Sequence, residues 1–90
     1  MSLALYLWDT EFIIAESVDD AKELARVEMR RNGVTEQHIE AMEHDEVQKL
    51  DDDHEVSVED WGGIRGMATV APASFFIRES GRGWLATTEF

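Results

Sequence analysis

Two short apolar runs open the chain, and their residue types predict a β-hairpin. Residues 3–8 and 11–15 are rich in leucine, isoleucine and aromatic residues, which favour strands. Only Asp9 and Thr10 separate the two runs, so a tight turn must join them. This pair lacks the glycine that two-residue turns prefer, and one longer bent strand is therefore the alternative.

A helical pattern follows the hairpin and ends near Gly33. Ser17 precedes the pattern, and its hydroxyl can accept a hydrogen bond from the amide of Asp20. Two arginines suit the negative end of the helix, and Gly33 can take the left-handed conformation that closes it. The apolar side chains recur on one stripe, with Leu24 at its edge: Val18, Ala21, Ala25 and Met29.

The middle of the chain predicts a second helix and then a strand. Thr35 is an N-cap candidate, and Ile39 and Met42 give a thin apolar face that extends to about residue 44, or to Leu50 on a longer interpretation. Residues 55–59 alternate between polar and apolar, as a half-buried strand does. Residues 61–63, Trp-Gly-Gly, end this strand, and residues 62–70 are predicted to be a loop.

Residues from 73 onward have two interpretations. They can form two alternating strands around a glycine turn, or a short helix from Pro72 to Gly81 followed by one strand. Either order predicts one α+β domain over residues 1–90. Its N-terminal hairpin belongs to a three- to four-stranded, mostly antiparallel sheet, with two to three helices packed on one face.

Composition narrows the classes of function. The chain has no cysteine, which excludes disulfides, thiolate metal sites and cysteine nucleophiles. The first apolar run is too short to span a bilayer and lacks the basic flank of a signal peptide, so we expect a cytoplasmic protein without membrane contact.

Charge is concentrated in the middle of the chain. The formal net charge is -12, and residues 36–60 hold eleven acidic residues against Lys49 alone. Such a field repels phosphates, so we expect no direct binding of nucleic acid. Basic proteins and divalent cations would be attracted instead.

One candidate metal site lies in this acidic region, at Asp51, Asp53, His54 and Glu55. Three consecutive aspartates without an internal glycine do not match the alternate spacing of calcium loops, so a solvated turn is the favoured interpretation. No serine has a histidine or lysine at a nucleophile-like spacing, and no glycine pattern forms a phosphate loop. We therefore predict no catalytic residues and no cofactor.

A second candidate site combines an aromatic residue with arginines in the least acidic third of the chain. Trp61, followed by two glycines, is the expected exposed anchor for a partner, with Arg65 and Arg82 beside it. Trp8 and Trp84 are expected in the core on neighbouring strands. A second copy of the chain is one candidate partner, which would give a homodimer.

Two segments carry a resemblance to known sequences. WDTEFIIAESVDDAKELA resembles the opening of small uncharacterised phage and prophage proteins, and GRGWLATTEF resembles their ending. Together they cover about a third of the chain. The resemblance implies a helix at residues 72–80, and it implies no activity, cofactor or site residue.

These patterns favour a non-enzymatic, acidic accessory protein of phage or prophage type that binds a protein partner. In a sharper form of this hypothesis, the acidic segment mimics nucleic-acid charge and occupies the basic groove of a DNA-binding protein. The alternative is a divalent-cation-binding module or a small metal-dependent enzyme that uses the acidic cluster at residues 51–55.

Overall fold

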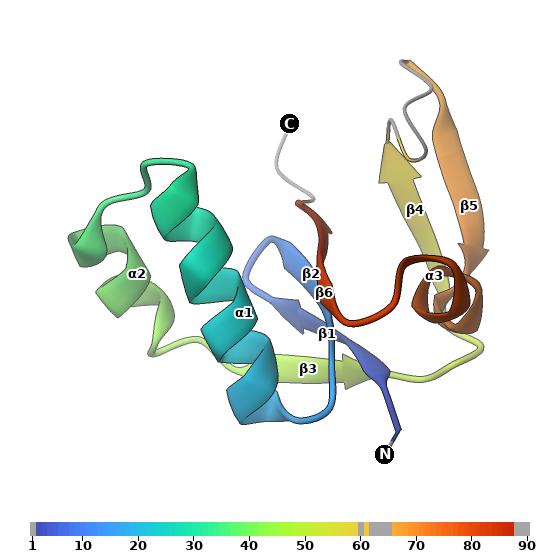
Figure 1. The fold of residues 1–90 in the computed structure, drawn as a ribbon, viewed down its shortest axis with the longest axis horizontal. Helices are drawn as coiled ribbons and strands as arrows, with labels where there is room; N and C mark the ends of the chain where they lie inside the picture. Colours follow the sequence, from blue (N-terminus) through green and yellow to red (C-terminus); the bar gives the residue numbers. More distant parts are fainter. Residues whose placement is uncertain (1, 60, 62–65, 88–90) are drawn as a thin grey trace.

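A computed structural model of the chain describes residues 2–59, 61 and 66–87. Its elements are β1 (Ala4–Trp8), β2 (Glu11–Ala15), α1 (Val18–Arg31), α2 (Glu36–Met42), β3 (Val47–Leu50), β4 (Glu55–Glu59), β5 (Ala68–Pro72), α3 (Ala73–Ser80) and β6 (Gly83–Thr87). The α+β prediction and the helix after Pro72 are confirmed (Figure 1).

The central sheet contains four strands in the order β3-β1-β2-β6, and each neighbouring pair is antiparallel. β1 and β2 form the predicted hairpin, in which Trp8 pairs with Glu11 across the two-residue turn. Asp9 closes this turn with a φ of 54°, a left-handed conformation that aspartate tolerates better than most residues. The alternative of one bent strand is therefore excluded.

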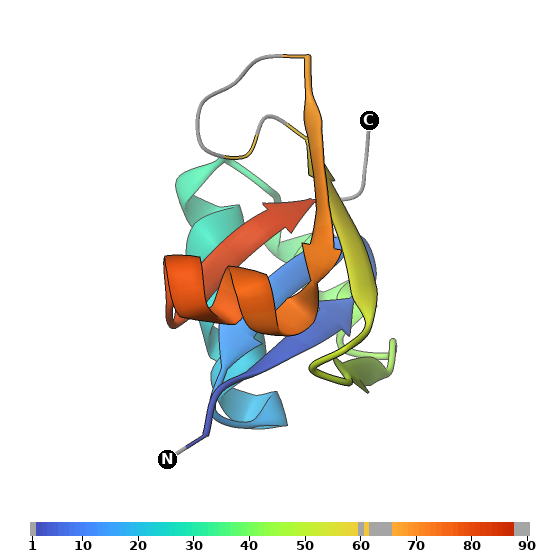
Figure 2. The ribbon, with the colours of Figure 1, turned by 90° about the vertical axis from the view of Figure 1, so that its right-hand side faces the viewer.

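Both faces of the central sheet are covered, because β1 and β2 carry apolar residues at successive positions. Tyr6, Trp8 and Ile13 pack on the side of α1 and α2. Leu5 and Ile14 pack on the other side, with α3 and the two-stranded sheet β4-β5. Two helices thus share one face as expected, whereas α3 lies on the opposite face (Figures 1 and 2).

Local signals place α1 as predicted. The Ser17 hydroxyl accepts a hydrogen bond from the Asp20 amide at 3.1 Å. At the other end, the Val34 amide donates to the Met29 carbonyl at 2.9 Å and the Gly33 amide donates to the Arg30 carbonyl at 3.1 Å. This is the Schellman arrangement, and Gly33 supplies its φ of 80°.

The prediction that Val18 belongs to the buried apolar stripe of α1 is wrong. Val18 is 42% exposed, whereas the alanines and the methionine further along the stripe are buried. Val18 is the first residue of the helix, next to the Ser17 cap, where the chain has only just turned away from the sheet.

The sequence patterns predicted neither β3 nor β5 as a strand. β3 occupies the stretch that a longer second helix would have used, and β5 begins in the predicted loop of residues 62–70 and extends two residues beyond it. In β3 only the terminal residues, Val47 and Leu50, are partly buried, so the strand has no period-two pattern. Pairing with β1, in the register of Leu5 with Leu50, forms this strand instead.

The tryptophans differ from expectation in one respect. Trp8 is fully buried and Trp84 is partly buried, but their strands, β1 and β6, are separated by β2. The Trp8 indole donates to the Met42 carbonyl at 2.9 Å, and the Trp84 indole donates to the Glu11 carboxylate at 3.0 Å.

None of the described helices is long and apolar enough to cross a membrane.

Candidate functional site: an acidic surface without cations

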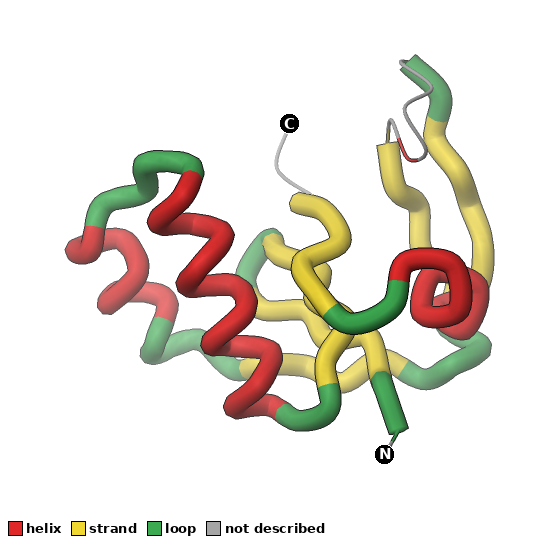
Figure 3. The backbone as a smooth tube through the Cα atoms, in the orientation of Figure 1, coloured by secondary structure: helices red, strands yellow, loops and turns green. Residues whose placement is uncertain are grey.

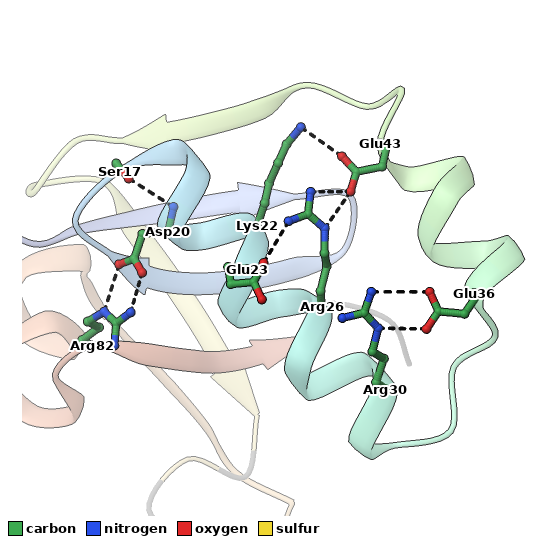
Figure 4. A network of polar contacts seen from close by, with 9 residues as sticks. All are labelled: Ser17, Asp20, Lys22, Glu23, Arg26, Arg30, Glu36, Glu43 and Arg82. Carbon is green, nitrogen blue, oxygen red and sulfur yellow. Dashed lines mark hydrogen bonds and ion pairs between the residues drawn. The ribbon is translucent and has the colours of Figure 1, made fainter.

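The lysine and the arginines of α1 form ion pairs with acidic residues of the same chain. Arg26 Nε donates to Glu43 Oε1 at 2.7 Å, and Lys22 Nζ lies 3.4 Å from the other oxygen of Glu43 (Figure 4). Lys22 Nζ and Arg26 Cζ also lie over the Trp8 ring, 5.4 and 5.8 Å from its centroid, respectively. The hydrogen bond from Arg26 lowers the pKa of Glu43, with a smaller contribution from Lys22. This group joins α1 to the end of α2.

Arg82, predicted to bind a partner, is held in a two-point ion pair with Asp20. Its Nε donates to one carboxylate oxygen of Asp20 at 3.0 Å and its Nη2 donates to the other (Figure 4). The Glu16 amide donates to the same carboxylate at 3.0 Å. The bond from Arg82, and then that from Glu16, lower the pKa of Asp20. Arg82, the residue before β6, therefore connects the start of that strand to the start of α1.

Three further ion pairs occupy the remaining arginines of the described chain. Arg30 lies 2.8 Å from Glu36, and Arg31 lies 3.4 Å from Glu28. Arg78 lies 3.6 Å from its neighbour Glu79.

The acidic residues of the middle segment are mostly left without cations. Of the eleven acids in residues 36–60, Glu36 and Glu43 are ion-paired and Asp60 lies outside the described residues. The other eight are all exposed, and no described lysine or arginine forms an ion pair with them. We call them the acidic surface: Glu40, Asp45, Glu46, Asp51, Asp52, Asp53, Glu55 and Glu59.

The acidic surface follows consecutive elements of the chain. It begins on α2, passes both ends of β3, and continues through the turn at residues 51–54 onto β4 (Figure 1). On β4, the glutamates alternate with Val56 and Val58, which are buried. The fold thus leaves these carboxylates exposed to solvent.

The turn at residues 51–54 has a structural role of its own. The Ala73 amide donates to the His54 carbonyl at 2.8 Å, and the Ser74 amide donates to the Asp52 carbonyl at 2.9 Å. Pro72 precedes α3 without a side-chain cap, so these carbonyls satisfy the first amides of the helix. Figure 3 shows the turn as a loop beside α3.

The candidate metal ligands are not brought together. Asp51, Asp53, His54 and Glu55 are all exposed. Among the residues that the structure describes, no three His, Asp or Glu side chains are placed to hold one metal ion.

The candidate aromatic anchor is partly buried. The Trp61 ring packs against Phe75 and Phe76, with centroid distances of 5.3 and 5.5 Å. It extends the apolar cluster under β4 and α3. Arg65 lies outside the described residues, and Arg82 contacts α1 instead. The roles of these three residues in partner binding remain predictions.

No family model, curated protein or solved structure matches this chain. The resemblance to phage and prophage proteins therefore stays a prediction from the two segments that carry it.

Proposed function

We propose that this protein is a non-enzymatic interaction protein that binds a basic protein partner through its acidic surface. One observation carries the proposal: eight exposed carboxylates form no ion pair with a described lysine or arginine, while six basic side chains of the described chain are engaged with other acids. Acids that served only the fold would be expected to share those cations.

Folding gains little from this arrangement. Like charges on neighbouring residues repel one another, and Asp51, Asp52 and Asp53 are consecutive. Screening in physiological salt acts over about 8 Å, so neighbouring carboxylates still interact. A partner that brings lysines or arginines would relieve this repulsion and would be steered into contact by the field.

The finer proposal concerns the class of the partner. Exposed carboxylates that form no ion pair present the same sign of charge as a phosphate backbone, to which the basic groove of a DNA-binding protein is complementary. We propose that the partner is such a protein and that this chain competes with nucleic acid for its groove.

The test is affinity capture from a lysate of the source organism with three immobilised chains. They are the wild type, the double variant Asp51→Asn/Asp53→Asn, and a control double variant, Glu16→Gln/Asp19→Asn, which removes the same charge outside the acidic surface. Bound proteins are eluted with increasing salt, identified, and then tested for displacement from DNA by the free wild-type chain.

We expect the wild type and the control to retain basic proteins that elute as salt rises, and the Asp51→Asn/Asp53→Asn variant to retain less of them. Displacement of DNA from an eluted protein would support the finer proposal. Equal retention by both double variants, or captured proteins without a basic bias, would refute binding through the acidic surface.

A further inference from the structure

β5 is an open edge of the two-stranded sheet. In the described part of the chain it pairs with β4 alone, in the register of Val56 with Ala71. Figure 2 shows β5 nearest to the viewer, with no described element in front of it. A second strand could therefore approach its outer side.

The backbone of β5 offers free groups on that side. Ala73 donates to His54 at 2.8 Å, and this pair continues the register in which Glu55 faces Pro72. Hydrogen-bonded pairs alternate with pairs that are not hydrogen-bonded along an antiparallel ladder. Counting from the bonded pair of His54 and Ala73, the pair of Ser57 and Val70 is the third along and is not hydrogen-bonded. The amide and carbonyl of Val70 consequently point away from β4.

The edge also lacks the usual protection against strand addition. Edge strands commonly carry charged side chains that discourage pairing, as β3 does with its exposed Lys49. β5 has the uncharged sequence Ala-Thr-Val-Ala-Pro, and Val70 is 56% exposed. Met67, just before the strand, is 61% exposed. Pro72 restricts pairing only at the end of the strand.

The exposed side chains of β4 beside β5 indicate which kind of segment would pair with β5. Glu55, Ser57 and Glu59 are exposed on β4, directly across from Pro72, Val70 and Ala68. A strand added outside β5 would lie about 9–10 Å from β4, two strand spacings away. Lysine or arginine residues at alternate positions of that strand would share the exposed face of Val70 and the two glutamates, so their aliphatic stems can cover Val70 while their charged ends extend toward the glutamates.

We infer that β5 accepts an extended, lysine- or arginine-containing segment of the basic partner as an added antiparallel strand. This inference rests on the proposed function and assigns the contact by which the partner is held. Main-chain hydrogen bonds provide affinity in this mode, and alternate side chains provide specificity. A second copy of the chain fits less well, because two chains of charge -12 would be brought together.

The probe is an eight-residue peptide of alternating lysine and valine, titrated against the full chain by fluorescence or calorimetry. The deciding variant is Val70→Pro, which removes an amide that the ladder with β4 does not use, and its control is Val70→Thr, which keeps the amide. Independently of any variant, the same peptide with N-methyl groups on its lysine residues keeps its charge but loses the amides that would face β5 in the added strand.

We expect Val70→Thr to bind the peptide as the wild type does, and both Val70→Pro and the N-methyl peptide to reduce binding by about tenfold or more, the loss of one to two backbone hydrogen bonds. Equal binding of the methylated and unmethylated peptides would overturn strand addition. Concentration-dependent dimers of the wild type that Val70→Pro abolishes would also overturn it, since they make a second copy the occupant.

The two proposals fail separately. If captured basic partners are lost with Asp51→Asn/Asp53→Asn but retained with Val70→Pro, the acidic surface binds and β5 does not. If no basic partner depends on the acidic surface, the proposed function fails irrespective of the peptide result.

Discussion

At the scale of single residues, the contacts that the sequence predicts are the local ones. Ser17 and Thr35 each accept a bond from an amide three residues ahead, as expected from their positions before helical patterns. The bond from Trp8 to the carbonyl of Met42 spans 34 residues, and the pair of Asp20 with Arg82 spans 62. An apolar pattern places Trp8 in a core, but it carries no information about such distant partners.

Replacing Trp8 with phenylalanine tests the first of these distant contacts. The variant keeps an aromatic side chain in the core but is smaller and removes the indole donor, so the Met42 carbonyl keeps only its bond from the Asp45 amide at 2.9 Å. We expect a loss of about 2 kcal/mol in the free energy of unfolding, measured with urea. The matched control is Trp84→Phe, whose indole bonds a partly exposed carboxylate, and it should lose less. Equal losses in the two variants would contradict the assignment.

Replacing Asp20 with asparagine tests the second contact through its dependence on pH. Because Arg82 holds the pKa of Asp20 below its ordinary value, the stabilisation is complete above that ordinary value and is lost as pH falls through the lowered one. We therefore expect Asp20→Asn to lower the melting temperature at pH 7, and the difference from wild type to shrink in strong acid. Asp19→Asn, which removes a neighbouring acid, should change it little. A difference that persists unchanged in strong acid would rule out the ion pair as its source.

At the scale of elements, the sequence predicted the segments with strong patterns and missed those formed by pairing. The hairpin, α1, β4 and β6 follow from periodicity and caps. β3 has no apolar alternation, and β5 carries an uncharged, partly exposed stretch that resembles a loop. Both strands form because a neighbouring strand provides hydrogen bonds for them. The turn at residues 51–54 likewise acquires its role from α3, which follows it by about twenty residues.

The capping role of this turn predicts its response to cations. Since its carbonyls cap α3 and its carboxylates are exposed, calcium, magnesium, manganese and zinc should each raise the melting temperature no more than sodium chloride of equal ionic strength. A specific cation at a hundred times its dissociation constant would add about 2.7 kcal/mol, which thermal unfolding detects easily. Such a shift in the wild type, absent from Asp51→Asn/Asp53→Asn, would restore the metal-site alternative.

At the scale of the whole molecule, the sequence established the amount of charge and the structure established its distribution. The net charge of -12 and the acidic middle segment are visible in the sequence. The engagement of the basic residues with Glu36, Glu43 and Asp20 is not, because it depends on how α1 faces α2 and β6. That pairing separates acids that stabilise contacts between elements from acids that face only solvent.

This separation predicts how stability depends on salt. We expect the free energy of unfolding of the wild type to rise with sodium chloride as the repulsion among the unpaired acids is screened. The Asp51→Asn/Asp53→Asn variant should be at least as stable as the wild type at low salt, and its stability should depend less on salt. A clear loss of stability in this variant at low salt would mean that the carboxylates serve the fold.

The most direct test is the rate at which the protein associates with a captured basic partner, measured from low to high salt. Three chains are compared: the wild type, Asp51→Asn/Asp53→Asn, and the control Glu16→Gln/Asp19→Asn. If the acidic surface recognises the partner, association slows as salt rises, and the first double variant is slower than the control at low salt. Equal rates for the two double variants, or a rate independent of salt, would contradict the proposal that the acidic surface is where the partner binds.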